Sequence, residues 1–317
     1  MLKIIRKQWF ILAILTGACF GYKFNLELKS ISNYTIYVIP PVLFLMSLNL
    51  DWHILSKAFK NRKAIFLTLF LSFLVMPLIG FLLGKIFLSQ EAELFKGIIV
   101  AVAAGGTIGS SIIWTKVSGG NYALSLILSI MITLLSAFFS PLIILIYLGK
   151  SIHLPLVSMI TNLLLITFFP VILAQVLKAY IDFSRLKPFT TPLSQILIIV
   201  MVSGTMAKAA DLLTARMIFL AVPIVVFLNT IMMIISYFGS QKLGFNRRDA
   251  IAISFASSQI TLSTSVFIAL HYFEAITVLP ALIYHLSQQI LSVFFAEFFK
   301  KQKMEVLPKK VTLKVSI

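Results

Sequence analysis

Ten apolar segments dominate this 317-residue sequence and constrain its fold more than any other feature. They occupy residues 9–20, 31–48, 64–87, 97–114, 123–148, 156–177, 192–206, 217–238, 250–270 and 275–298. A helix needs ~20 such residues to cross the hydrocarbon core of a bilayer, and only the first and seventh segments are clearly shorter. Barrel strands would alternate apolar and polar residues, which these unbroken runs do not. We therefore predict an all-α membrane protein with ten transmembrane helices.

The charged residues support this class and set an orientation. Charged residues make up 12% of the chain and hydrophobic residues 60%, whereas soluble domains carry about 25% charged residues. Twenty of the 27 Lys and Arg residues lie at the termini and in alternate loops. Because basic residues stay on the cytoplasmic side, both termini are predicted to be cytoplasmic, in a multi-pass protein of the cell membrane. The net charge of +17 then reflects topology and attraction to anionic lipid, and no nucleic-acid partner is expected.

Two polar patches interrupt the fourth and ninth segments. Residues 103–111 read Ala-Ala-Gly-Gly-Thr-Ile-Gly-Ser-Ser, and residues 254–263 form a second hydroxyl-rich patch. Glycine and hydroxyl residues suit a helix that is broken at membrane depth, which is tolerated only against protein or a wet cavity. We predict breaks at residues 105–111 and 256–258 that cross one another. One patch in each half of the chain is typical of a transport site.

The fifth segment adds polar groups at helical spacing. Asn121, Ser125 and Ser129 recur every four residues and therefore share a helix face. Their oxygens would suit a hard cation such as Na⁺. The same residues would equally serve as hydrogen-bonding contacts between helices, and spacing alone leaves both readings open.

The ionisable side chain of His285 lies well inside the last apolar segment, and Gln288 shares its helix face. Ionisable groups inside a membrane are functional candidates, so any response of transport to pH is expected to trace to His285. The alternative is a neutral histidine bonded to a facing hydroxyl. Motifs for catalysis are absent from the sequence, and the single Cys19 excludes an intramolecular disulfide. The chain is thus not expected to be an enzyme.

Several stretches, in order, carry a resemblance to a known family: residues 44–50, 72–81, 105–107, 120–125 and 279–289. Together they are similar to the bile acid:sodium symporter family, and residues 115–121 resemble its subgroup with poorly defined substrates. The resemblance implies two inverted five-helix repeats with broken, crossing helices 4 and 9. It also implies sodium-coupled uptake of organic anions by alternating access. The repeats would be residues 1–150 and 151–300, followed by a basic cytoplasmic tail at 301–317.

The resemblance, the helical spacing and the intramembrane histidine together give the candidate residues. The predicted ion-binding set is Ser110, Ser111, Asn121, Ser125, Ser129 and Gln259. The predicted substrate-binding set is Thr107, which matches the family's crossover threonine, with Ser257, Ser258, His285 and Gln288. Apart from Na⁺, no cofactor is expected. The predicted partners are a small organic anion, sodium and the lipid bilayer.

Three positions depart from the family pattern. Ser72 stands in place of a glutamine, Phe255 in place of the glutamate shared by both sodium sites, and Ile260 in place of an asparagine. No Asp or Glu lies in the middle of any segment, so two sodium ions would leave uncompensated charge. One neutral-ligand sodium site, proton coupling and uncoupled transport remain open. The substrate is predicted to be an amphipathic anion, such as a sterol-like carboxylate or sulfonate; a non-transporting regulator or scaffold is the alternative from a different class.

Overall fold

The computed structural model describes residues 9–48, 61–106, 109–149, 155–183 and 185–305, with the backbone only at residues 11, 29–32, 187 and 302–305. Within these ranges the chain is helical, and its only extended pairing is one isolated bridge. Thr107, the first eight residues and residues 306–317 of the predicted tail lie outside the described residues. The all-helical class is thus confirmed for the described part of the chain.

The helices follow the apolar segments closely. The first half contains α2 (Trp9–Lys23), α3 (Asn25–Ser32), η1 (Thr35–Val38), α4 (Ile39–Ser47), α6 (Arg62–Phe70), the π-helical turn η2 (Leu71–Val75), α7 (Met76–Phe87), α8 (Ala92–Ala103), α9 (Ser110–Val117) and α10 (Tyr122–Leu148). The second half contains α11 (Leu156–Tyr180), α12 (Lys187–Ala209), η3 (Ala210–Leu212), α13 (Ala215–Lys242), α14 (Arg247–Ser258), α15 (Leu262–Tyr272), η4 (Ala275–Val278) and α16 (Leu279–Glu305). Each of the ten predicted segments overlaps at least one of these helices.

Several helices begin at a side chain that satisfies a free backbone donor. Asn and Thr are favoured at this position because their oxygen accepts from an N–H of the first turn. The side chains that accept such a bond are Asn61 before α6, Asn121 before α10, Thr214 before α13 and Asn246 before α14. These polar residues mark where the apolar runs begin.

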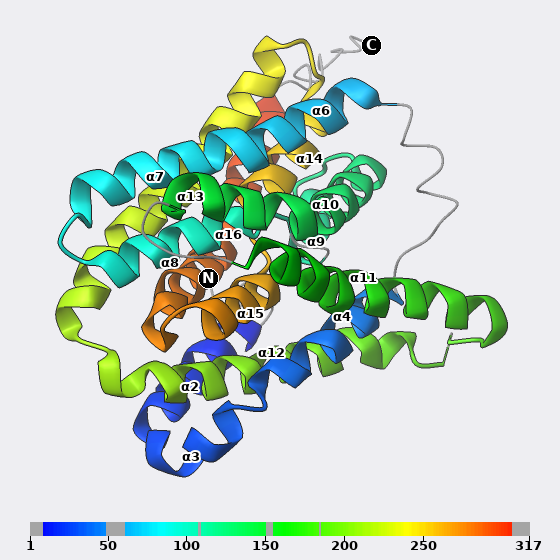
Figure 1. The fold of residues 1–317 in the computed structure, drawn as a ribbon. Coiled ribbons are helices and arrows are strands. Elements are labelled where there is room, and N and C mark those ends of the chain that lie inside the picture. The colour runs from blue at the N-terminus through cyan, green and yellow to red at the C-terminus, as the bar shows by residue number, and fades with distance from the viewer. Residues whose placement is uncertain (1–8, 49–60, 107–108, 150–154, 184, 306–317) are drawn as a thin grey trace, which may run out of the picture.

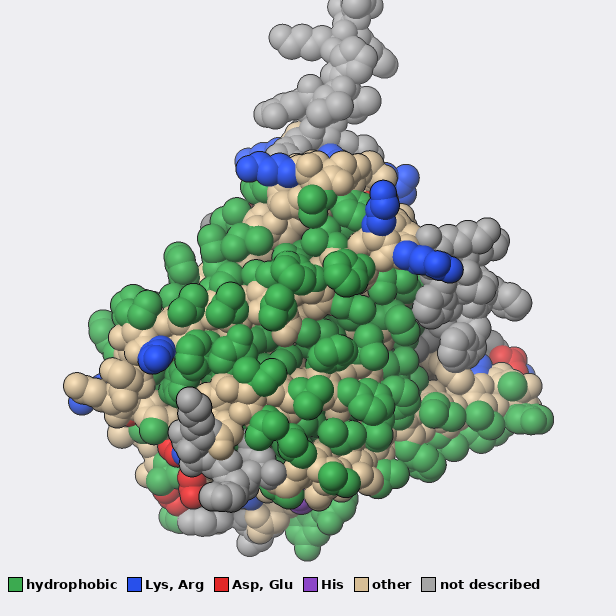
Figure 2. Space-filling view, turned by 45° about the horizontal axis from the view of Figure 1, so that its top comes forward, with side chains coloured by type: hydrophobic (Ala, Val, Ile, Leu, Met, Phe, Trp, Pro, Cys, Tyr) green, Lys and Arg blue, Asp and Glu red, His purple; other side chains and the backbone are tan. Residues whose placement is uncertain are grey.

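Six helical stretches in the described residues are long and apolar enough to cross a membrane. Along the stretch from Arg62 to Phe87, large apolar side chains recur every four residues and are 44 to 72% exposed: Phe66, Phe70, Leu74, Leu78, Leu82 and Ile86. Water would not favour such a stripe, whereas lipid tails would. Figure 2 shows hydrophobic side chains over most of one face, with Lys and Arg side chains gathered at its top. The chain is a multi-pass membrane protein.

The helices form two groups (Figure 1). In the first, which we call the panel group, α12 packs against α2, α3 and α4, and α4 packs against α11. The second, which we call the core group, contains α6 to α10 and α13 to α16, with α10 packed against α8 and α14. Two segments of the core group are broken: α8 and α9 form one, and α14 and α15 the other. The two breaks position the site.

Candidate functional site: the helix crossover and its cavity

The two broken segments cross by pairing their backbones. Gly105 and Ile260 form an antiparallel bridge. Gly106 N–H donates to the Gln259 carbonyl, and Thr261 N–H donates to the Ala104 carbonyl, each at 2.9 Å. Each break thereby satisfies backbone groups of the other, which a membrane interior demands.

The predicted crossing of the breaks is confirmed, but their bounds need correction. The first break lies between Ala103 and Ser110, so Ser110 and Ser111 open helix α9 instead of lying in the break. The second break lies at residues 259–261, so residues 256–258 form the last turn of α14. Small residues in that turn are compatible with a helix, and the helix ends where pairing with residues 104–106 begins.

Gly106 is required by both conformation and space. Its φ is +75°, in the left-handed region that favours glycine. A Cβ atom there would lie 2.7 Å from Cγ2 of Ile132 on α10. The close approach of α10 to the crossover therefore depends on this glycine.

Side chains extend the crossover into a polar chain. Ser110 Oγ donates to Gln259 Oε1 at 2.7 Å, and Gln259 Nε2 donates to Ser292 Oγ at 3.0 Å. Ser292 in turn donates to the carbonyl of Gln288. Helices α9, α14 and α16 are thus linked through one glutamine.

A hydroxyl cluster joins α9 to α10. Ser111 Oγ and Ser129 Oγ lie 2.6 Å apart, and Thr115 Oγ1 donates to Ser125 Oγ at 3.0 Å. Ser129 also donates to the Ser125 carbonyl at 2.8 Å. All four side chains are fully buried. The structure therefore brings together three of the predicted ion ligands and adds Thr115.

Other predicted residues lie elsewhere. Asn121 caps α10 and donates to Asp249 Oδ1 at 2.7 Å, one turn beyond the hydroxyl cluster. Ser257 donates to Ser236 on α13, and Ser258 donates back to the Ser254 carbonyl, so neither side chain lines the cavity described below. Thr107 is outside the described residues.

His285 and Gln288 lie against the second break. Gln288 Oε1 accepts from Ile260 N–H at 2.9 Å, and its Nε2 lies 3.3 Å from the Ile260 carbonyl and 3.0 Å from His285 Nδ1. The other ring nitrogen of His285, Nε2, is buried and has no hydrogen-bond partner among the described residues. The alternative reading of His285, a neutral histidine bonded to a facing hydroxyl, is wrong, because its Nδ1 lies against the amide of Gln288.

A cavity of about 760 Å³ begins at the crossover and lies between the two helix groups. Panel residues such as Leu43, Met46 and Ile198 form one wall, and core residues such as Ile112 and Leu126 form the other. Three buried polar atoms without partners belong to residues that line it: Thr133 Oγ1, Thr261 Oγ1 and His285 Nε2. Unpartnered buried polar atoms are uncommon in proteins, and here three of them belong to residues around one cavity.

The charge of the cavity is positive on balance. The N-terminal ends of α9 and α15 both line it, through Gly109, Ser110, Leu262 and Ser263. Helix N-termini carry partial positive charge and free N–H groups. The charged lining residues are Lys116, Glu297 and Lys300. Such a site favours an anionic group.

A sequence profile of the SBF-like CPA transporter family matches residues 8–301. The chain belongs to this family. Sodium/bile acid cotransporter 7-A of Xenopus laevis is 27% identical over 315 residues, which cover 92% of this chain and 91% of that protein. Sodium/bile acid cotransporter 7 of Danio rerio is 24% identical, with 90% and 92% covered. The uncharacterized sodium-dependent transporter YocS of Bacillus subtilis is 24% identical, with 95% and 96% covered. The resemblance read from the sequence motifs is confirmed.

In this member of the SBF-like family, the position where a shared glutamate was expected is apolar. Phe255 is fully buried, and its ring lies 5.8 Å from the ring of Phe299. Ser72, where a glutamine was expected, lies in the π-helical turn, and its buried hydroxyl has no partner within the described part of the chain. No group of three or more His, Cys, Asp or Glu side chains within the described ranges could hold a metal. The crossover of this SBF-like chain thus offers neutral oxygens only.

Sequence reasoning missed several residues of the site, although weak signals existed for some. Thr133 continues the four-residue spacing of Ser125 and Ser129, and Thr261 lies in the second hydroxyl-rich patch. Trp114 Nε1 donates to Gln289 Oε1 at 3.0 Å, which joins α9 to α16 at the cavity wall. That pair is 175 residues apart, so no local pattern could have indicated it.

Proposed function

We propose that this protein is a secondary transporter that moves an amphipathic organic anion by alternating access at the crossover. The observation that carries the proposal is the set of three unpartnered polar atoms, from Thr133, Thr261 and His285, on residues that line one cavity. A buried polar atom without a partner costs about 1 to 3 kcal/mol. A substrate that hydrogen-bonds to all three would recover much of that free energy.

The cavity supports an anion with a large apolar body. Its volume of about 760 Å³ lies within the 300 to 1,000 Å³ typical of ligand sites. The apolar walls would hold a sterol-like body, while the two helix N-termini and the neutral donors would hold a carboxylate or sulfonate. The names of the cotransporter relatives, which mention bile acid and sodium, agree with this choice.

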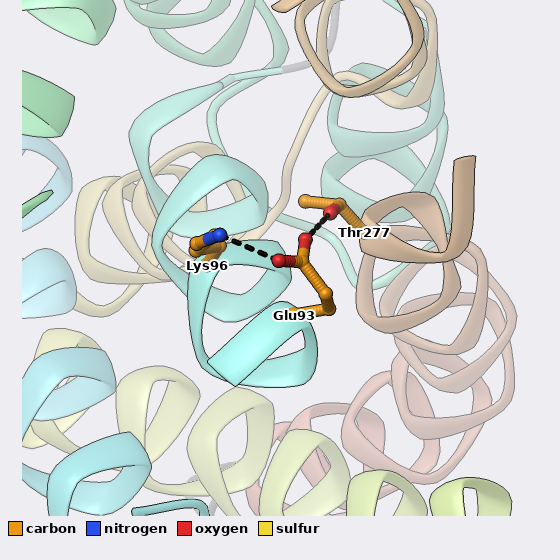
Figure 3. A network of polar contacts seen from close by, with 3 residues as sticks. All are labelled: Glu93, Lys96 and Thr277. Carbon is orange, nitrogen blue, oxygen red and sulfur yellow. Dashed lines mark hydrogen bonds and ion pairs between the residues drawn. The ribbon is translucent and has the colours of Figure 1, made fainter. Parts of the chain in front are cut away.

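Alternating access is supported by the closed contact on the far side of the crossover from the cavity. Helix α8 reaches the crossover from the end that carries Glu93, and α9 leaves it toward Lys116 at the cavity. Glu93 on α8 accepts a hydrogen bond of 2.8 Å from Thr277 on η4 and pairs with Lys96 (Figure 3). The backbones are so close there that a Cβ on Gly97 would lie 2.4 Å from the Thr277 carbonyl.

This arrangement corresponds to an inward-facing state. By the distribution of basic residues, Lys116 and Lys300 belong to the cytoplasmic side and Glu93 to the outer side. The repeats at residues 1–150 and 151–300, each with one broken helix, would exchange the two openings by inverted symmetry. Both termini would then be cytoplasmic in the cell membrane.

Sodium coupling is proposed at one site at most. Ser111, Thr115, Ser125 and Ser129 supply four neutral oxygens that already converge. A hard cation accepts such ligands, but Phe255 supplies no carboxylate to compensate its charge. Ser110, the neighbour of Ser111 in sequence, is bonded to Gln259. We propose that these two residues lie next to the bound ion and do not complete its ligand set.

The decisive experiment combines thiol labelling with uptake. In a Cys19→Ser background, Ser110→Cys should react with a charged thiol reagent because Ser110 lines the cavity, whereas Ser258→Cys, fully buried on α14, should not. Purified protein in liposomes should take up labelled cholate or taurocholate. Equal, slow labelling at both positions together with no uptake would favour a non-transporting regulator or scaffold. Uptake of only cations or neutral solutes would refute the anionic substrate.

A further inference from the structure

The amide of Gln288 has an orientation that the backbone dictates. Ile260 N–H donates to Oε1 of Gln288, and Nε2 of Gln288 donates to the Ile260 carbonyl. Exchanging the two ends of the amide would place N–H against N–H and oxygen against oxygen. The peptide groups of Ile260 cannot adapt, because the bridge to Gly105 holds this residue from its other side. The amide orientation of Gln288 is therefore fixed.

The fixed amide in turn determines which nitrogen of His285 carries the proton. The NH₂ group of Gln288 lies 3.0 Å from Nδ1 and can only donate. Nδ1 must therefore accept, and a neutral imidazole has one proton, so that proton is on Nε2. An imidazolium would place a second N–H against the same NH₂ group.

The proton on Nε2 is buried beside the cavity, on a residue that lines it. His285 is 6% exposed, lines the cavity, and has no partner for Nε2 among the described side chains and backbone. Thr133 and Thr261 line the same cavity and also have unpartnered hydroxyls, which can donate or accept. His285 differs from these hydroxyls because its only available group is a donor.

We propose that Gln288 is a positioning residue that fixes His285 as the neutral Nε2–H tautomer. His285 then offers the substrate an N–H group that can donate a hydrogen bond to an acceptor oxygen but cannot accept one. The inference rests on the proposed substrate site and adds a selectivity rule to it. A ligand that brings a carboxylate, sulfonate or carbonyl oxygen to His285 is accepted. A ligand that brings an ammonium or amide N–H to the same place meets donor against donor and is rejected.

The tautomer can be measured without any transport assay. The full-length protein, labelled with ¹³C,¹⁵N-histidine and held in lipid, contains four histidines, and the His285 signals are those lost in His285→Gln. Nε2 is recognised as the ring nitrogen that correlates with both Cε1 and Cδ2. At neutral pH we expect Nε2 to carry the proton and Nδ1 to carry none. A protonated Nδ1 in the wild-type protein would overturn the proposal.

Two matched variants test the role of Gln288. In Gln288→Glu the carboxylate can only accept, so Nδ1 of His285 should gain a proton. Gln289→Glu, one residue further along α16, places a carboxylate against Trp114 Nε1 instead and should leave the His285 tautomer unchanged. A folded Gln288→Glu protein with Nδ1 still unprotonated would overturn the positioning role. If Gln288→Glu does not fold, the wild-type spectrum decides. Failure of cholate uptake with the expected tautomer would refute the proposed function, and the selectivity rule with it, but would leave the positioning of His285 by Gln288 standing.

Discussion

Ser110 donates a hydrogen bond of 2.7 Å to the side-chain oxygen of Gln259, although 149 residues separate them in sequence. Ser110 is the first residue of α9, and Gln259 is the C-cap of α14. The bond therefore joins the broken helix of one half of the chain to that of the other, in a partly buried position beside the cavity. Because Gln259 also donates to Ser292 on α16, the crossover is held by side chains as well as by its backbone bridge.

A double-mutant cycle on Ser110→Ala and Gln259→Ala should show coupling of about 1 kcal/mol in the free energy of unfolding, the typical net value of one hydrogen bond. The measurement is denaturant unfolding of the purified protein in mixed micelles. As a control, Ser110→Ala should combine additively with Ser236→Ala, because Ser236 bonds to Ser257 and shares no partner with Ser110. Additivity in the first cycle would show that the bond does not form in the membrane protein.

The sequence predicted the helices and the existence of the crossover because both depend on local composition. Long apolar runs define the helices, and glycine with hydroxyl residues marks the first break. The end of α14 was misplaced by about three residues, since Ala256, Ser257 and Ser258 are neutral in a helix. The break occurs where residues 259–261 find backbone partners in residues 104–106, which is a tertiary effect.

Spacing predicted only in part which polar side chains of α10 meet α9. Ser125 and Ser129 do meet α9, but Asn121 at the same spacing is the helix cap, and its amide is committed to Leu124 N–H and Asp249. The helix boundary, not the periodicity, decided the role of Asn121. The contacts of Gln288 with Ile260 could not be read from the sequence, because they depend on how α16 packs against the second break.

Gly106→Ala should destabilise the protein by about 2 to 4 kcal/mol, because it combines a left-handed backbone with a steric clash. The added Cβ would lie 2.7 Å from Ile132 Cγ2. Gly119→Ala is the matched control: φ there is +72°, and no atom lies within 4 Å of the added carbon. Gly119→Ala should lower the stability only by the cost of a left-handed backbone at a residue with a side chain, about 1 to 2 kcal/mol. Equal losses, measured by thermal unfolding in detergent, would contradict the close packing of α10 on the crossover.

Thr277→Val should weaken the closed contact on the outer side, because it removes the hydroxyl that donates to Glu93 and keeps the side-chain shape. Loss of about 1 kcal/mol would lower the ratio of inward-facing to outward-facing protein by roughly fivefold. The measurement is the rate at which Ser110→Cys is labelled in inside-out compared with right-side-out vesicles. Lys96→Gln should have little effect, since Lys96 pairs with Glu93 within α8 itself. A large effect of Lys96→Gln with none of Thr277→Val would exclude this contact as the closure.

Sodium dependence should be weak and noncooperative, because the oxygen cluster around Ser129 is neutral. A carboxylate 4 Å from the ion would add about 4 kcal/mol at an effective dielectric constant of 20, and Phe255 cannot supply it. We expect anion uptake in liposomes to show a Hill slope of at most one in sodium. Ser129→Ala, which removes an oxygen bonded to Ser111 and Ser125, should raise the half-maximal sodium concentration by ~10-fold or abolish the dependence. Ser140→Ala lies on the same helix but bonds to the Ala103 carbonyl, so it should leave sodium dependence unchanged. A Hill slope near two would mean that two ions bind without the carboxylate, and the single neutral site would then be wrong.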